Sequence, residues 1–142
     1  MMRPLLAAAG ISALMLIAVA PRAALSHGDV TPQPVDTTGL EALGSEWRTE
    51  NPFRGNAAAV KIGMSAYNQN CARCHGIDAI SGGIAPDLRA LDDNAEGDAW
   101  FINRVRKGAM INGDVKMPPF ENLMNQEAMW AIRAYIDSRP TE

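Results

Sequence analysis

The strongest constraint on this chain is a pair of cysteines three positions apart, followed at once by a histidine. The segment reads Cys71-Ala72-Arg73-Cys74-His75, and it holds both cysteines of the 142-residue sequence. On a helical turn, two thiols at this spacing can reach the two vinyl groups at one porphyrin edge, and the histidine that follows can reach the iron. The segment therefore predicts one haem c, held covalently by Cys71 and Cys74, with His75 as an axial iron ligand.

Two other uses of such a cysteine pair are a redox-active dithiol and half of a zinc site. A zinc site needs further Cys or His ligands, and the only other histidine is His27. A thioredoxin-like domain needs a β-sheet, for which the sequence shows no strand-like alternation. Haem attachment is therefore the interpretation that the sequence favours.

The first 26 residues have the pattern of a secretory signal peptide. Arg3 precedes an apolar run from Leu5 to Ala20, and Ala24-Leu25-Ser26 supplies the small residues that signal peptidase requires. We expect cleavage before His27 and export to the periplasm. An uncleaved membrane anchor is the alternative, because the run is nearly long enough to cross a bilayer.

Cleavage would make the chain more acidic. It would remove two of the 13 Lys and Arg residues and none of the 16 Asp and Glu residues, so the formal net charge would change from −3 to −5. Such a chain is not expected to bind nucleic acid or an anionic membrane surface, and no stable membrane insertion is expected after cleavage. The charge favours a partner with a basic docking face.

We expect residues 27–56 to form an irregular N-terminal arm and residues 57–142 to form the haem domain. The arm is rich in Pro and Gly and shows no sustained helical or strand period. It carries Trp47 and Phe53, however, which a disordered tail seldom needs. We expect it to pack across the domain.

Three segments of the domain have helical patterns. The first begins at Ala57 and runs into the Cys-His segment, the second covers Asp98 to Lys107 with Gly108 as its stop, and the third begins after Asn125 and closes at Pro140. Long Gly-rich loops separate them, as expected when a cofactor fills the core. The predicted fold is small and all-α, with about three main helices around the haem.

The sixth iron ligand is expected to be a methionine, because no free cysteine and no nearby histidine remain. Met64 and Met129 fall at helical spacing, where core packing explains them. Outside the helices and the signal lie three candidates, Met110, Met117 and Met124. Met117 is favoured, because Pro118 and Pro119 fix an extended backbone beside it, and Met110 is the alternative.

Several other residues have two interpretations each. The acidic run of Asp92, Asp93, Glu96 and Asp98 is more simply a solvated loop than a docking patch. The cations Arg104, Arg106 and Lys107 either complement the helix dipole or pair with haem propionates, and Trp100 either packs or donates to a propionate. A copper site at an N-terminal His27 is not favoured, since no second histidine is free.

The haem region resembles the class I cytochrome c family. That family has a glycine and an aromatic residue four positions apart before the first cysteine, and Gly63 and Tyr67 match them. The resemblance implies that Gly63 admits the C-terminal helix, which would cross it near Ile132 and Tyr135. It also implies that Tyr67 lies at the haem.

The same resemblance assigns further residues of the haem site. It implies that the carbonyl of Pro86 accepts the imidazole proton of His75 and that Leu88 lies on the haem wall. The Met-Pro segment of the family corresponds to Met117-Pro118. With His75 and Met117 both on the iron, the protein would be an electron carrier and not an enzyme.

The arm resembles that of the soluble periplasmic cytochromes c that accept electrons from ethanol dehydrogenases dependent on pyrroloquinoline quinone (PQQ). The resemblance rests on stretches of the arm such as 27–32 and 40–44, together with residues 66–70 before the cysteine pair. It implies such a dehydrogenase as electron donor and a downstream cytochrome or terminal oxidase as acceptor. The alternatives are a donor of the methanol dehydrogenase type, a membrane-anchored cytochrome subunit, and an open-site haem protein that senses or reduces a small ligand.

Overall fold

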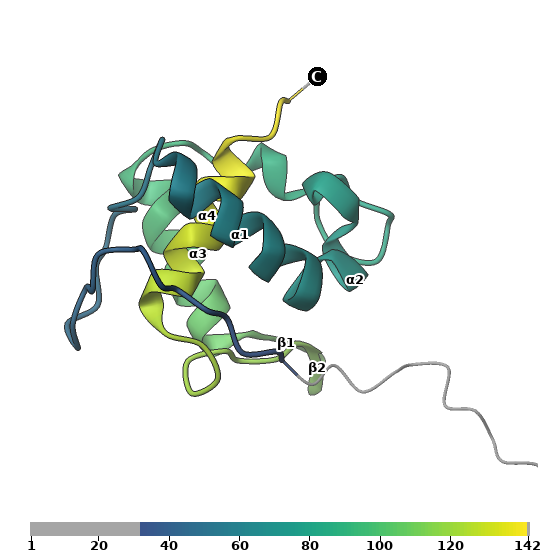
Figure 1. Ribbon diagram of the computed structural model, residues 1–142. Coiled ribbons are helices and arrows are strands. Elements are labelled where there is room, and N and C mark those ends of the chain that lie inside the picture. Colours follow the sequence, from purple (N-terminus) through teal and green to yellow (C-terminus); the bar gives the residue numbers. More distant parts are fainter. Residues whose placement is uncertain (1–31, 142) are drawn as a thin grey trace, which may run out of the picture.

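The computed structural model describes residues 32–141, and it shows a mostly helical domain with an irregular arm wrapped round it (Figure 1). Three helices are long: α1 (Ala57–Asn70), α3 (Ala95–Lys107) and α4 (Gln126–Asp137). The short helix α2 (Ala72–His75) follows α1 directly, and two 3-10 turns lie at Ile77–Ala79 and Leu88–Ala90. Between α3 and α4 lies an antiparallel hairpin of β1 (Ala109–Ile111) and β2 (Asp114–Met117).

The predicted signal peptide and its cleavage point lie outside the described residues.

Each long helix begins at an asparagine cap. The side-chain oxygens of Asn56, Asn94 and Asn125 accept hydrogen bonds from backbone N–H groups in the first turns of α1, α3 and α4. Helix α3 ends at Gly108, whose φ of 71° few other residues adopt without strain. The predicted cap of α4 and stop of α3 are confirmed, whereas α3 begins three residues before Asp98 because Asn94 caps it.

Helices α1 and α4 cross at Gly63 and form the centre of the core. A Cβ atom on Gly63 would lie 1.9 Å from the carbonyl oxygen of Ala131, so only glycine permits this approach. The backbone N of Ile132 is also close, at 3.0 Å, as expected. The ring of Tyr135, also on α4, packs against Tyr67 of α1, with ring centroids 5.2 Å apart.

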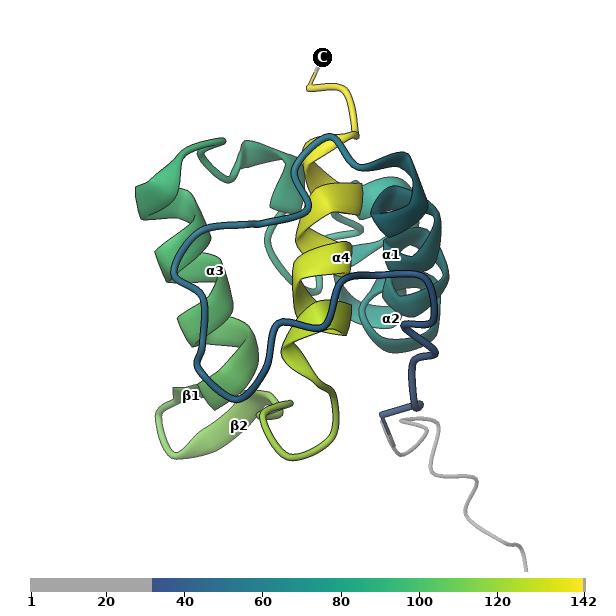
Figure 2. The same ribbon diagram turned by 60° about the vertical axis from the view of Figure 1, so that its left-hand side comes forward.

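The arm packs against the helices, and in Figure 2 it crosses in front of α4. Its backbone N–H groups donate to side chains of α4, from Leu43 to Glu127 at 2.7 Å and from Arg48 to Gln126 at 3.1 Å. Phe53 is buried in the core, as is Leu43. The expectation that the arm packs on the domain is therefore confirmed for its described part.

A buried carboxylate joins the arm to α3 and α4. Asp98 accepts from the backbone N–H of Asn51 at 2.8 Å and forms ion pairs with Arg54 at 2.7 Å and Arg133 at 3.0 Å. Burial opposes its ionisation, but these donors outweigh burial and hold the pKa of Asp98 below its ordinary value. Assigning the whole acidic run to a solvated loop was therefore wrong for Asp98, although Asp92, Asp93 and Glu96 are exposed.

The hairpin corrects the all-α prediction. Its turn is Asn112-Gly113, with φ of 53° and 86°, and an Asn-Gly pair favours the tight turn that joins two antiparallel strands. The strands are too short to show alternation, so only the turn residues signalled them.

A second correction concerns Met64, which was expected in the core but is exposed, whereas Met129 is fully buried as predicted.

No helix within residues 32–141 is long and apolar enough to cross a membrane. His27, at which a copper site was not favoured, lies outside the described residues.

Candidate functional site

The cysteine pair lies where α1 passes into α2. The backbone N–H of Cys71 donates to the carbonyl of Tyr67 at 2.7 Å, and that of His75 donates to Cys71 at 3.0 Å. The three side chains therefore lie on one compact turn, as the spacing predicted. Both thiols are free and half-buried, so the structure shows no disulfide between them.

The environment of Cys71 does not suit a redox-active dithiol. Burial, reinforced by the neighbouring Cys74, raises the pKa of the Cys71 thiol to about 12. A reactive dithiol needs the thiolate near neutral pH, so this thiol is poorly placed to attack a disulfide. Nor does any group of three His, Cys, Asp or Glu side chains among residues 32–141 have the arrangement of a metal site.

One nitrogen of His75 is already engaged. Its Nδ1 lies 2.9 Å from the carbonyl oxygen of Pro86. A carbonyl can only accept, so this contact places the proton on Nδ1 and leaves Nε2 with a lone pair for a metal. The structure thus brings together the two residues that the family resemblance had paired.

Tyr67 supports this turn from inside the core. Its side chain is fully buried and its hydroxyl donates to the carbonyl of Gly76 at 2.8 Å, directly after His75. Burial raises the pKa of the phenol well above its ordinary value, so Tyr67 remains a neutral donor. Leu88 is half-buried in the second 3-10 turn and packs against the core.

The structure separates the three candidate methionines. Met124 is buried in the core and Met110 in β1 is 68% exposed. Met117 is half-buried at the end of β2, beside the two prolines. A Cβ on Gly108 would lie 2.3 Å from the Met117 carbonyl oxygen, so the end of α3 fixes the backbone at this methionine. Met117 combines partial burial with a fixed backbone.

Large apolar side chains are exposed in two segments near these residues. Ile77 and Ile84, in the loop after His75, are 75% and 77% exposed. Met110 and Val115 of the hairpin pair across the two strands and are 68% and 62% exposed. Clusters of this kind indicate a surface that something apolar covers. A porphyrin suits both this chemistry and the donor set of two thiols, one free imidazole nitrogen and a thioether.

Arg104, Arg106 and Trp100, each of which has two interpretations from the sequence, have partners in the protein. The guanidinium of Arg106 lies 4.1 Å from the Trp47 ring centroid and pairs with Glu121. Trp100 is 48% exposed beneath Arg104, whose guanidinium lies 5.1 Å from the ring centroid. For Arg104 and Arg106, the structure therefore shows roles in local packing.

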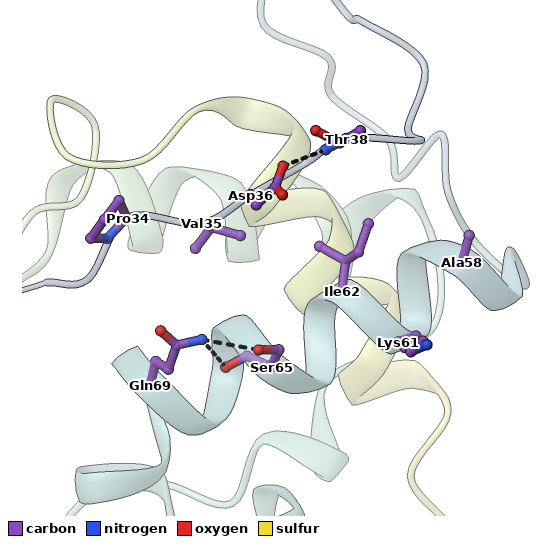
Figure 3. Close-up of a pocket in the computed structure, with 9 residues that line it drawn as sticks. All are labelled: Pro34, Val35, Asp36, Thr38, Ala58, Lys61, Ile62, Ser65 and Gln69. Carbon is purple, nitrogen blue, oxygen red and sulfur yellow. Dashed lines mark hydrogen bonds between the residues drawn. The ribbon is translucent and has the colours of Figure 1, made fainter.

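A separate groove lies between the arm and α1 (Figure 3). Val35 and Ile62 are among its apolar lining residues, and Lys61 and Asp36 are its charged ones. Asp36 accepts from the backbone N–H of Thr38 at 2.9 Å. The groove contains none of the candidate ligands, and it is distinct from the Cys-His turn.

Comparison with known proteins gives a family match over most of the helical domain. Residues 58–136 match the family model described as "Cytochrome C oxidase, cbb3-type, subunit III". The chain is 57% identical to cytochrome c550 of Pseudomonas aeruginosa over 141 residues, which cover 96% of this chain and 92% of that protein.

Two further similarities are to parts of much larger proteins. Quinohemoprotein alcohol dehydrogenase ADH IIB of Pseudomonas putida is 34% identical over 95 residues, which cover 67% of this chain but 13% of the dehydrogenase. A solved structure of quinohemoprotein alcohol dehydrogenase ADHIIG from Pseudomonas putida HK5 aligns with 70% of this chain and 14% of its own, at 30% identity and a TM-score of 0.49.

Proposed function

Because the chain belongs to the class I cytochrome c family, and so is an electron carrier with covalently bound haem c, we propose that it accepts electrons from a PQQ-dependent alcohol dehydrogenase. The proposed substrate of that dehydrogenase is ethanol. The proposed compartment is the periplasm, which the signal-like segment at residues 1–26 supports.

The observation that carries the proposed donor is the double likeness. The chain is similar along nearly its whole length to a cytochrome c550, and also to a short part of quinohemoprotein alcohol dehydrogenases. In those enzymes the similar stretch belongs to the dehydrogenase chain itself. A separate protein of the same kind is suited to take electrons from a dehydrogenase that it meets by diffusion.

Four side chains are proposed to hold the haem. Cys71 and Cys74 bind the porphyrin through thioether bonds, and Nε2 of His75 and the sulfur of Met117 bind the iron. Haem c supplies a one-electron couple at its iron. Two protein ligands leave no free position for oxygen or another small molecule, so this arrangement favours an electron carrier over a ligand sensor.

The surrounding residues set how well these ligands bind. The Pro86 carbonyl fixes the tautomer of His75 and orients its ring, which makes the imidazole a stronger donor. Tyr67 and Leu88 support the site from the core side. A thioether from Met117 favours ferrous iron and raises the reduction potential relative to a second nitrogen ligand.

The proposed acceptor is a downstream cytochrome or a terminal oxidase. The chain carries more Asp and Glu than Lys and Arg, and loss of residues 1–26 would make the imbalance larger. A partner with a basic docking face would therefore be attracted at long range, and such encounters are weak and depend on salt.

Mixing experiments test the proposed donor. The ferric protein is mixed with ethanol and a PQQ-dependent ethanol dehydrogenase, and haem reduction is followed by absorption. We expect rapid reduction that slows as salt rises, because ions screen exposed charges beyond about 8 Å at physiological ionic strength. A PQQ methanol dehydrogenase with methanol and an unrelated quinoprotein are the controls. Reduction no faster with the ethanol enzyme than with these would remove the named donor and leave the general carrier standing.

Carbon monoxide separates this function from an open-site haem protein. Ferrous iron with two strong protein ligands binds the gas poorly, whereas an open site binds it readily. Rapid formation of a carbon monoxide complex by the untreated protein would favour the ligand-binding alternative.

A further inference from the structure

The loop that carries Pro86 is closed on itself by one serine. The hydroxyl of Ser81 donates to the carbonyl of Ala85 at 2.6 Å, and its backbone N–H donates to the carboxylate of Asp87 at 3.3 Å. These two acceptors flank Pro86 on both sides in the chain. The two hydrogen bonds that Ser81 donates therefore hold the Pro86 carbonyl, the acceptor for His75, in position.

Pro86 needs this external support. A proline has no backbone N–H, so this residue cannot anchor itself by donating a hydrogen bond. The preceding residues include Gly82 and Gly83, and Gly83 has a φ of 90°. Glycines leave the backbone many alternative conformations, so contacts outside the peptide of Pro86 must select the observed one.

Asp87 is the centre of that support. Its carboxylate also accepts from the backbone N–H of Arg89 at 3.0 Å and from the guanidinium of Arg89 at 2.9 and 3.1 Å. The hydrogen bonds from Arg89, opposed by partial burial, lower the pKa of Asp87 to about 2, so it is ionised at neutral pH. Arg89 donates in turn to the carbonyl of Pro140 at 3.1 Å, which ties the loop to the chain beyond α4.

We propose that Asp87, together with Ser81 and Arg89, is a positioning unit that sets the hydrogen bond from His75 to Pro86 and thereby tunes the reduction potential. The proposal rests on the proposed role of His75 as an iron ligand. Asp87 acts through Pro86 and His75 and is not itself a ligand.

The expected sign follows from the hydrogen bond. A strong bond from Nδ1 to the carbonyl makes the imidazole a better electron donor, which stabilises ferric iron. If the carbonyl moves away, the donor weakens and the potential rises. Asp87 follows Pro86 in the chain and acts on the His75 hydrogen bond only indirectly, so we expect at most about a tenfold change in the ferrous-to-ferric ratio. For a one-electron couple, a tenfold change corresponds to about 59 mV in the reduction potential.

Three variants separate positioning from simple charge effects. Asp87→Asn removes a negative charge, Arg89→Gln removes a positive charge, and Ser81→Ala changes no charge. If only charge matters, the first raises the potential, the second lowers it and the third leaves it unchanged. If position matters, all three raise it. Glu96→Gln, at an exposed residue of α3, is the control for loss of a carboxylate.

The potentials are measured on the full haem-loaded protein by spectroelectrochemistry with chemical mediators and no dehydrogenase present. Failure of the proposed donor therefore leaves this test intact. Proton NMR of the ferrous protein reports the Nδ1 proton of His75, which should exchange faster with solvent in each variant. A wild-type spectrum without an axial histidine would instead remove the ligand role of His75, which is a different failure.

The expected result is a higher potential and faster Nδ1 proton exchange in all three variants, and neither change in Glu96→Gln. A lower potential in Arg89→Gln, with Ser81→Ala unchanged, would overturn the proposal in favour of charge alone. Ser81→Ala removes a single hydroxyl, so it keeps the test decisive if a charged-residue variant fails to fold.

Discussion

The face of α4 beneath the arm and the region around the Cys-His turn are built differently. Beneath the arm, charged groups are buried as ion pairs, and the Arg133 side chain is fully buried against Asp98 and Asp137. Around the turn, Ile77 and Ile84 are largely exposed, as is Met110 of the hairpin.

This difference shows which part of the molecule is complete in the polypeptide alone. Charges can be buried beneath the arm because Asp98 and Asp137 both meet guanidinium groups, and such groups are costly to bury without partners. The apolar side chains of the other region lack such a cover among residues 32–141. These exposed side chains are consistent with a site in which a bound haem covers them.

The largest effect is expected from removing the two thiols. In Cys71→Ala with Cys74→Ala, haem should extract completely into acid acetone, because no covalent bond would hold it to the denatured chain. The wild type should retain all its haem. The extracted fraction is measured by absorption, and haem that leaves the wild type freely would refute covalent attachment through these residues.

The next effect concerns the hairpin, which carries two of the candidate methionines. We expect Met117→Ala to abolish the weak near-infrared band of ferric methionine ligation, lower the potential and open ferrous iron to carbon monoxide. Met110→Ala is the matched control, since Met110 lies on the same hairpin and is more exposed. Loss of the band in Met110→Ala alone would move the ligand to that residue.

A smaller effect, on stability and not on the haem, is expected beneath the arm. Asp98→Asn removes the buried charge that faces Arg54 and Arg133, and breaking such a pair typically costs about 3 to 5 kcal/mol. Urea unfolding of the haem-loaded protein measures the change. Glu96→Gln, on the same helix but exposed, should shift stability by no more than about 0.5 kcal/mol. Equal effects of the two would mean that the buried network does not hold the arm.

The same carboxylate gives a pH dependence of known sign. Because the folded-state pKa of Asp98 is lowered, its stabilisation is present above the unfolded pKa of about 3.9 and is lost as pH falls from there through the folded value. The loss of stability below about pH 4 should therefore be shallower in Asp98→Asn than in the wild type. An identical acid unfolding curve would contradict this.

The sequence by itself determined the local features. The spacing of Cys71, Cys74 and His75 predicted one compact turn, and Asn125 and Gly108 marked helix ends that the structure bears out. These features depend on residues within a few positions of one another, so short-range geometry is enough to predict them. Asn112-Gly113 is also a local signal, but the strands beside it have only three and four residues, too few to show the alternation that identifies a hairpin.

Tertiary structure decided whatever joins distant parts of the chain. Asp98 stands in an acidic run like its neighbours, and only the approach of Arg54 from the arm and Arg133 from α4 makes it a buried ion-pair partner. Met64 follows the same helical period as residues of the core, yet it is 44% exposed to solvent. Helical periodicity shows which residues share a face, but what packs against that face depends on contacts that the period does not contain.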